Sequence, residues 1–459
     1  TSKNIKNYFS NNNLIPINDN LIDKIFKFKE KKNKPFYSLK KSITGQTHQS
    51  KILKITNFLK SKNADYLFIS APENTAWLLN IRGYDNPNSP IPNARLIIDK
   101  NKKIFLIAKK DYLKKIIKEK KINKNQVIDI EDISKLIKTL KGKNFIIDSE
   151  TCSIFYENII KSKFKILYKE DPIYKLKSIK NLCEINHMIE AHKKDGLALT
   201  KFIYWIKNVN KKKITEVDAQ NKLAKFRKLS KDYLFPSFNT IAGSGSNGAI
   251  IHYRATTKTT KKINKKDIFL VDSGGQYNYG TTDVTRTICF TNQKNSIKNA
   301  YTNVLKGHIA VALTDLQKDN IGKKIDIRAR KFLKKKGLGY AHGTGHGVGF
   351  FLNVHEGPQS ISKYNSIKIE KGMILSNEPG YYKKDHFGIR IENLVYAKKL
   401  KNKLVFENLT LAPLEKDLVD YKLLNKTEKN YLFRYHLNIY SEYSSSLNKK
   451  ERKWLASLI

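Results

Sequence analysis

Cysteine is scarce in this sequence, with three thiols among 459 residues. Cys152, Cys183 and Cys289 lie far apart and form no Cys-x-x-Cys pair. Their number and spacing exclude a small domain stapled by disulfides and a zinc site built from paired thiolates. Because free thiols are typical of a reducing compartment, we expect the protein to be cytoplasmic.

Long hydrophobic runs are also missing. No stretch approaches the roughly 18 consecutive apolar residues of a membrane span. The first residues, TSKNIKNYFSNNN, contain no apolar core of a secretory signal peptide. We therefore expect no membrane partner. The length of the chain fits about three domains of ordinary size.

Acidic residues are few, since 41 Asp and Glu face 88 Lys and Arg and leave a formal charge of +47. Such a charge favours nucleic acid or an anionic membrane as partner. Only 10 of the 88 basic residues are Arg, however, and the 78 Lys are spread along the whole chain with abundant Ile and Asn. This pattern fits a codon bias toward A and T, whereas nucleic-acid readers favour Arg for bidentate contacts. We expect a solvated Lys-rich surface and no specific nucleic-acid binding.

The order of apolar runs and helical patterns divides the chain into parts. Residues 1–41 are polar and indicate a tail or connector. Residues 42–170 alternate helical stretches with the apolar runs YLFIS, ARLIID, KIFLIA and NFIID, which is typical of an α/β domain. Residues 171–459 form a second unit with Gly-rich loops and short β-branched runs, and 405–459 are a helical extension.

A Gly-rich stretch over 243–248 matches the dinucleotide-binding pattern G-x-G-x-x-G. That pattern needs a helix that starts on the glycines and an acidic residue about 20 positions later. Here the run AIIHYRATT over 249–257 follows, and its β-branched residues predict a strand. We therefore expect no nucleotide site.

Two segments of the second unit share one pattern, in which an acidic residue follows an apolar run and a second acidic residue follows a turn. In the first, Asp272 ends an apolar run, and Gly-rich turns lead to Asp283, 11 residues later. In the second, Glu378 takes the place of Asp272, and Glu392 follows 14 residues later. Each pair is expected on neighbouring strands of a hairpin, where both side chains can face one point. Four converging carboxylates repel one another unless cations lie between them, which predicts a pair of divalent metal ions.

The loop HGTGHGVG over 342–349 lies between these two segments. Its glycines let the backbone approach closely, and it supplies an imidazole. Four carboxylates and one His, without thiolate, form an oxygen-rich set that suits Mn²⁺ and similar ions better than structural Zn²⁺.

These motifs resemble the pita-bread metallopeptidases of the creatinase fold, and among them the large cytosolic aminopeptidase P (Xaa-Pro aminopeptidase) branch. The matching segments are NTAWLLNIRG (74–83), LKSIKNLCEINHMIEAHKKDGLAL (176–199), FPSFNTIAGSGSNGAIIHY (235–253), VDSGGQYNYGTTDVTRT (271–287), HGTGHGVG (342–349), NVHEGP (353–358), NEPGYY (377–382), GIRIEN (388–393) and FENLTLAPLEKDLVD (406–420). The resemblance implies an α/β creatinase-like N-terminal domain over 42–170 and an α+β pita-bread catalytic domain over 171–459.

The resemblance also implies a reaction and a ligand set. The N-terminal Xaa-Pro bond of a peptide would be hydrolysed by a hydroxide that bridges two divalent ions, expected as Mn²⁺, with Co²⁺ or Zn²⁺ as alternatives. Asp272 would bind one ion, Asp283 and Glu392 would bridge both, and His346 with Glu378 would complete the second site. All five ligands are present, which argues against metal-free relatives of the fold such as creatinase.

Further residues match active-site positions of that family. His355 and His252 would hydrogen-bond the scissile carbonyl or the developing oxyanion, and His342 would help to form the proline pocket. Glu378 would carry a proton to the leaving nitrogen, and Arg390 matches an active-site arginine.

Three expectations concern the whole protein. Residue 1 is Thr, and residues 1–41 match only the tail of a further N-terminal domain of the relatives, so we expect an N-terminally truncated chain. A homodimer is expected, and the aromatic residues of the C-terminal helices indicate packing or a dimer seam; they are Tyr431, Phe433, Tyr435, Tyr440 and Trp454. A prolidase, which would cleave only dipeptides, and a non-catalytic binding scaffold stay open as alternatives.

Overall fold

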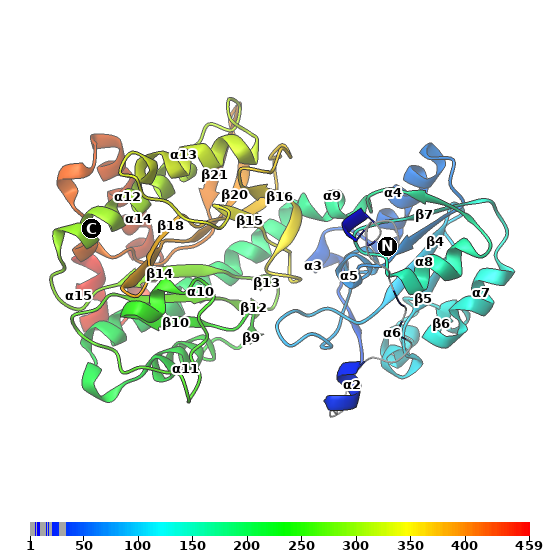
Figure 1. Ribbon diagram of the computed structural model, residues 1–459, viewed down its shortest axis with the longest axis horizontal. Coiled ribbons are helices and arrows are strands. Elements are labelled where there is room, and N and C mark those ends of the chain that lie inside the picture. The colour runs from blue at the N-terminus through cyan, green and yellow to red at the C-terminus, as the bar shows by residue number, and fades with distance from the viewer. Residues whose placement is uncertain (1–4, 6, 10–14, 16, 18–20, 27–33) are drawn as a thin grey trace. The chain divides into compact units, whose positions relative to one another are not determined.

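The structure is a computed structural model in which residues 5, 7–9, 15, 17, 21–26 and 34–459 are described. The chain divides into two compact units, Thr1–Lys177 and Ser178–Ile459 (Figure 1). Much of the predicted connector over 1–41 lies outside the described residues. Its described part includes the short helix α2 (Leu21–Ile25) and the two-residue strand β1 (Tyr37–Ser38).

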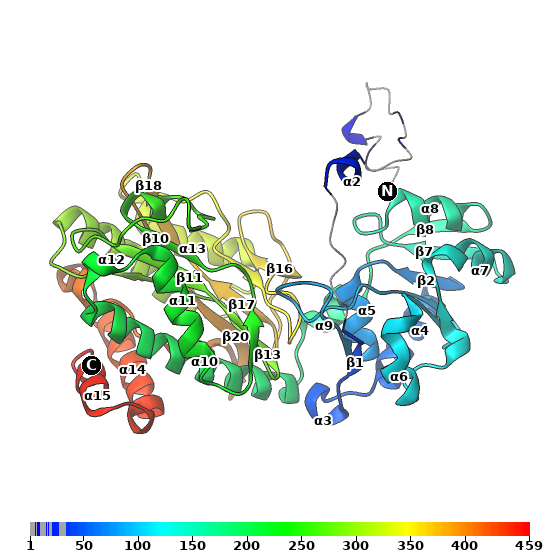
Figure 2. The ribbon, with the colours of Figure 1, turned by 90° about the horizontal axis from the view of Figure 1, so that it is seen from below.

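A mixed six-stranded sheet forms the centre of the first unit, and Figure 2 labels its strands β2, β7 and β8. The strand order is β6-β5-β4-β2-β7-β8. Its strands are β2 (Tyr66–Ile69), β4 (Arg95–Asp99), β5 (Ile104–Ile107), β6 (Val127–Ile128), β7 (Asn144–Ile147) and β8 (Lys165–Tyr168). The helices are α3 (Lys41–Thr44), α4 (His48–Ser61), α5 (Pro72–Leu79), α6 (Lys114–Lys118), α7 (Ile133–Thr139), α8 (Ile154–Lys161) and α9 (Ile173–Ser178). Phe68 and Phe145 of the sheet pack in one cluster with Ile137 of α7 and Ile160 of α8. The predicted α/β alternation is confirmed, and the four apolar runs are β2, β4, β5 and β7.

The second unit contains two main antiparallel sheets, β10-β11-β14 and β16-β15-β17-β20-β21 (Figure 1). Its strands are β9 (Tyr233–Pro236), β10 (Ile241–Ser244), β11 (Phe269–Ser273), β12 (Gly275–Tyr277), β13 (Gly280–Thr281), β14 (Val284–Ile288), β15 (Gly345–Gly347), β16 (Glu356–Ile361), β17 (Ile374–Asn377), β18 (Gly380–Lys383), β19 (Phe387–Arg390), β20 (Asn393–Leu400) and β21 (Lys403–Asn408). The helices are α10 (Leu182–Asn208), α11 (Glu216–Arg227), α12 (Asn295–Ala312), α13 (Gly322–Lys334), α14 (Lys426–Tyr443) and α15 (Lys449–Ala456).

Capping boxes fix the starts of α10 and α11. Asn181 caps α10 and exchanges hydrogen bonds with Glu184, and Thr215 and Asp218 do the same at α11. Each box satisfies backbone N–H groups that have no partner within the helix. None of the helices found among the described residues is long and apolar enough to cross a membrane.

The two acidic segments fold as antiparallel strand pairs. β11 pairs with β14, and β17 pairs with β20. Only Asp272 lies inside a strand, however, because Asp283 directly precedes β14, Glu378 directly follows β17 and Glu392 directly precedes β20. The acidic residues therefore sit where the paired strands meet the loops, a place that leaves their side chains free to converge.

The strand predicted over 249–257 is wrong. The structure has a 3-10 helix over Gly245–Ala249, followed by turns and irregular backbone. The β-branched residues of this stretch pair with no neighbouring strand among the described residues, and the hydroxyl of Tyr253 within it binds the buried carboxylate of Glu216. The Gly-rich stretch thus starts no long helix, as expected for a chain without a dinucleotide site.

Arg286 of β14 connects the sheet β10-β11-β14 to the C-terminal segment. Its side chain is almost fully buried and donates hydrogen bonds to the carbonyls of Pro413 (2.9 Å) and Ala412 (2.8 Å). It also donates to Asn393 Oδ1 (2.8 Å) and to the hydroxyl of Tyr435 (3.1 Å) on α14. Because these acceptors are all neutral, the buried guanidinium needs several of them together to replace the water it has lost.

We expect Arg286→Met to lower the free energy of unfolding by about 3 kcal/mol, because several buried acceptors lose their donor together. Urea denaturation followed by far-UV circular dichroism measures the change. Arg434→Met is the matched control, since Arg434 is exposed on α14 and its replacement should change the free energy by less than about 0.5 kcal/mol. Equal stability of the two variants would show that the Arg286 network contributes nothing.

Candidate metal centre

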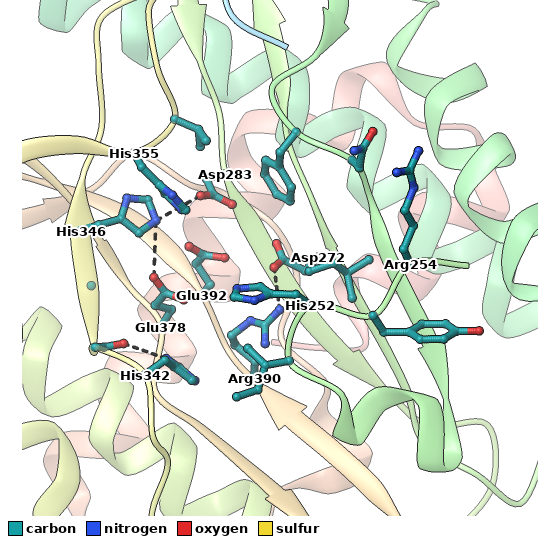
Figure 3. A pocket seen from close by; sticks show the side chains of 18 residues that line it. His252, Arg254, Asp272, Asp283, His342, His346, His355, Glu378, Arg390 and Glu392 are labelled. Carbon is teal, nitrogen blue, oxygen red and sulfur yellow. Dashed lines mark hydrogen bonds and ion pairs between the residues drawn. The ribbon is translucent and has the colours of Figure 1, made fainter. Parts of the chain in front are cut away.

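A cavity of about 460 Å³ in the second unit brings together every residue predicted for the site. Figure 3 shows their side chains pointing toward one another, with Glu392 in the middle of the group. The predicted residues that line the cavity are His252, Asp272, Asp283, His342, His346, His355, Glu378, Arg390 and Glu392. They come from segments that are far apart in the sequence, so only the folded chain assembles them.

The acidic side chains and His346 form two overlapping groups. Asp272, Asp283 and Glu392 each place one oxygen within 4.8 Å of the others. His346, Glu378 and Glu392 do the same, so Glu392 belongs to both groups. His346 Nε2 lies 3.5 Å from Asp283 Oδ2 and 3.5 Å from Glu378 Oε1, so one imidazole nitrogen faces both carboxylates.

The electrostatics of this cluster call for positive charge. Burial, and then the charges of Asp272 and Glu378, raise the pKa of Asp283 well above that of an ordinary Asp. Burial and the charge of Asp283 raise the pKa of Glu392 in the same way. Burial alone would also raise the pKa of Glu378, but the charge of His346 and further cationic groups hold it below its ordinary value. Buried carboxyls that resist ionisation in this way become stable carboxylates when a cation shares their space.

The two carboxylate oxygens of Asp272 also indicate that a cation is needed. Its Oδ2 accepts a hydrogen bond of 2.6 Å from Arg390, whereas its Oδ1 is buried and has no hydrogen-bond partner. Buried polar atoms are nearly always satisfied, so an orphaned carboxylate oxygen beside other carboxylates fits a metal ligand. The donor set present in the cavity therefore fits divalent metal ions.

A hydrogen-bonded chain links Arg390, Tyr382 and His342. Arg390 donates to the hydroxyl of Tyr382 (2.6 Å), which lies 2.9 Å from Nε2 of His342. The other ring nitrogen of His342 lies 2.7 Å from the carbonyl oxygen of Gly343, and burial lowers the pKa of the ring. A neutral ring that donates from Nδ1 and accepts at Nε2 satisfies all of these contacts.

His355 stacks edge-on against His346, with ring centroids 4.1 Å apart. The charge of His346, followed by burial, lowers the pKa of His355 to about 4. His355 is therefore neutral at pH 7 and can donate one hydrogen bond into the cavity. His252 lines the cavity next to Asp272 and Arg390 (Figure 3).

Two polar residues at the cavity were not predicted from the sequence, one that lines the cavity and one that contacts residues lining it. Tyr382 orients His342 and Arg390, and its place opposite Gly388 in the β18–β19 hairpin leaves room for the ring. Arg254 lines the cavity two residues after His252 (Figure 3). Tyr382 ends the matching segment NEPGYY (377–382), and Arg254 lies two residues after His252, so both were close to residues predicted for the site.

A separate group of possible ligands lies away from the cavity. Cys289, Glu415 and Asp417 place ligand atoms within 4.8 Å of one another. Lys207 already pairs with Glu415 (2.6 Å) and Asp417 (2.9 Å), so an ammonium supplies the positive charge there. This group does not need a metal ion.

Comparison with known proteins agrees with the fold and the cavity. Residues 186–399 match Metallopeptidase family M24, residues 28–184 match the Creatinase/Prolidase N-terminal domain, and residues 402–458 match the C-terminal region of peptidase M24. The chain belongs to metallopeptidase family M24, and within that family to the Xaa-Pro aminopeptidase P group. The predicted order of a creatinase-like domain and a pita-bread catalytic domain is thereby confirmed.

Relatives match over nearly the whole chain. Aminopeptidase P2 of Arabidopsis thaliana is 35% identical over 493 aligned positions, which cover 95% of this chain and 68% of the relative. Xaa-Pro aminopeptidase 1 of Dictyostelium discoideum is 35% identical, with 96% and 74% covered. The X-prolyl aminopeptidase of Caenorhabditis elegans, described as a cytosolic enzyme with a di-nuclear active site, superposes with a TM-score of 0.87 at 31% identity, covering 97% of this chain and 76% of that one.

Proposed function

We propose that this chain removes the N-terminal residue from peptides with proline in the second position. The observation that carries the proposal is the convergence of five metal-binding side chains in one cavity of a chain that belongs to the Xaa-Pro aminopeptidase P group. Nothing comparable in the described residues supports a scaffold without catalysis.

Asp272, Asp283, His346, Glu378 and Glu392 would hold two divalent metal ions. The oxygen-rich set favours Mn²⁺, with Co²⁺ or Zn²⁺ as alternatives. When bound, such ions lower the pKa of water enough to supply hydroxide near neutral pH and polarise the scissile carbonyl.

The remaining side chains act on the substrate. His355 and His252 donate hydrogen bonds to the scissile carbonyl oxygen and to the oxyanion that develops from it. The carboxylate of Glu378 accepts a proton from the attacking water and delivers it to the proline nitrogen as the bond breaks. His342, held by Tyr382, forms one wall of the proline pocket.

A peptidase assay tests the proposal. With Mn²⁺ present, the protein should release the first residue of an Xaa-Pro-Yaa tripeptide, measured by mass spectrometry, and leave the matched Xaa-Ala-Yaa peptide intact. The prolidase of Pyrococcus furiosus has a similar fold, with a TM-score of 0.62 at 25% identity. Cleavage of Xaa-Pro dipeptides but not of the Xaa-Pro-Yaa tripeptide would assign prolidase activity. If the protein cleaved neither the dipeptides nor the tripeptide, the proposal would be refuted.

The lysine-rich surface predicts weak binding to duplex DNA that is insensitive to sequence and falls steeply with salt. We expect the affinity measured by fluorescence anisotropy to drop at least tenfold between 50 and 200 mM salt, since each displaced counterion adds to the salt slope. Two duplexes of unrelated sequence serve as mutual controls. Tight, sequence-selective binding at physiological salt would revive the scaffold alternative.

The cytoplasmic location and the homodimer belong to the same proposal. Free thiols and a relative described as cytosolic support the location. Of the aromatic residues named above, Tyr435 packs in the core, whereas Phe433 on α14 is 48% exposed and supports a seam between copies.

A further inference from the structure

The cavity wall that carries His252 has little regular structure of its own. This wall segment, residues 244–261, runs from the last residue of β10 to the stretch that bridges back to α11 at Thr215. From Gly245 onward it consists of one 3-10 helix, turns and irregular backbone, so a strand ladder holds it only at Ser244, which pairs with Phe269 of β11. Ile251, His252 and Arg254 of the wall segment nevertheless line the cavity.

A single buried carboxylate binds the wall segment at both ends and in the middle. Oε1 of Glu216 accepts hydrogen bonds from the backbone N–H of Ser244 (2.7 Å) and from the amide of Asn247 (3.0 Å). Oε2 accepts from the hydroxyl of Tyr253 (2.9 Å) and from the backbone N–H of Lys261 (2.9 Å). Glu216 thus joins the two ends and the middle of the wall segment. Two direct hydrogen bonds also link these parts, from the amide of Asn247 to the hydroxyl of Tyr253 (2.8 Å) and from Lys261 Nζ to Ser246 Oγ (2.8 Å).

The charge of Glu216 is balanced without a cation. The residue is fully buried, and no ammonium or guanidinium among the described residues pairs with it. Glu216 is the first residue of α11. The N–H groups at the start of a helix have no partner within the helix and favour a negative charge nearby. Hydrogen bonds from the wall segment supply the rest of the stabilisation, because a buried carboxylate needs several donors.

Tyr253 connects this anchor to the cavity. Its side chain is buried, and its hydroxyl lies between Glu216 and the carbonyl of Thr259 (3.0 Å). The preceding residue, His252, points into the cavity beside Asp272 (Figure 3), and Tyr253 is itself among the residues that line the cavity. A shift of Tyr253 therefore moves His252 with it.

We propose that Glu216 is a positioning residue for peptide hydrolysis, which holds the wall segment so that His252 meets the scissile carbonyl. The inference rests on the proposed function, because it assigns Glu216 a role through a residue of that site. Glu216 touches neither the substrate nor the reacting atoms.

A double-mutant cycle tests this role. Glu216→Gln replaces an acceptor by an amide whose NH₂ faces other donors, and kcat/KM for an Xaa-Pro-Yaa peptide should fall about 10- to 100-fold, as expected for a misplaced catalytic group. In a His252→Ala background the same change should cost less than about threefold, because the group it positions is already gone. Equal losses in both backgrounds would assign Glu216 a purely structural role and overturn the proposal.

Two further variants keep the test interpretable. Tyr253→Phe removes one hydrogen bond of the anchor and should give a smaller loss that also disappears in the His252→Ala background. Glu428→Gln is the control, since Glu428 is a buried acid of the same unit that pairs with Lys306 (2.5 Å). It should lower the melting temperature and leave kcat/KM unchanged.

Hydrogen exchange tests the anchor without activity. Backbone amides of residues 244–261 should exchange at least tenfold faster in Glu216→Gln than in the unmodified protein, while those of α10 stay unchanged. Unaltered exchange over 244–261 would overturn the anchor even if activity fell. If the unmodified protein cleaved no Xaa-Pro peptide, the proposed function would fail, while the exchange result would still decide whether Glu216 holds the wall segment.

Discussion

Asp283→Ala should abolish metal binding and hydrolysis together. Asp283 contributes to the acidic group with Asp272 and Glu392, and its Oδ2 also lies 3.5 Å from His346. Its removal therefore takes a ligand oxygen from the first group and also removes the carboxylate that faces His346 of the second. We expect less than one bound metal ion per chain by mass spectrometry of metals, and a fall in kcat of more than about 10³-fold, since the metals supply the nucleophile.

Asp417→Ala is the matched control for this change. Asp417 is 65% exposed in its side chain and pairs with Lys207 outside the cavity. It should keep both metal ions and full turnover. An Asp283→Ala protein with two metal ions and near-normal turnover would sink the di-metal assignment.

The same variant should weaken a pH dependence of the stability of the metal-free protein. The folded pKa values of Asp283 and Glu392 lie above their ordinary values of 3.8 and 4.5. Between about pH 4 and the raised values, the folded protein binds more protons than the unfolded chain, so stability falls as pH rises. Metal-free Asp283→Ala should therefore melt higher than the metal-free parent at pH 7 and lose this advantage toward pH 4. Added Mn²⁺ should raise the melting temperature of the parent alone.

His355→Ala should lower kcat by a factor on the order of 10² to 10³, as for the loss of an oxyanion donor. His355 adjoins His346 in the cavity and is neutral at pH 7, so it can donate to the carbonyl oxygen. Because it is not counted among the five ligands, both metal ions should remain bound. Metal content, melting temperature and kcat are measured on one preparation.

His386→Ala is the control for a histidine outside the site. His386 is exposed in the turn between β18 and β19, and its loss should change neither kcat nor stability. Unchanged turnover of His355→Ala with a lower melting temperature would instead show that His355 only packs, and would remove it from the catalytic set.

The site could be located from the sequence because its chemistry is repeated. The same order of apolar run, first acid, turn and second acid occurs twice, with Asp272 and Asp283 in one copy and Glu378 and Glu392 in the other. This repetition can be recognised without knowledge of the fold. The convergence of all four in one cavity agrees with that pattern. Their individual roles as ligands stay a prediction until metal binding is measured.

The wall segment shows where local patterns fail. Its β-branched residues predicted a strand over 249–257, but a strand needs a neighbouring strand to pair with, and the structure has the end of a 3-10 helix, turns and irregular backbone there instead. Tyr382 escaped prediction for a related reason. Its hydroxyl gains its role only because folding brings His342 and Arg390 to either side of it.

The sequence by itself determined the α/β character of the first unit and the repeated pairs of acidic residues in the second, because periodicity and residue chemistry are local properties. Only the tertiary structure decided which atoms of Asp272 are satisfied, which rings of the cavity are neutral and which buried carboxylate holds the cavity wall. These features depend on distance and burial between residues far apart in the chain, and Coulomb and hydrogen-bond energies are set by that geometry rather than by residue order.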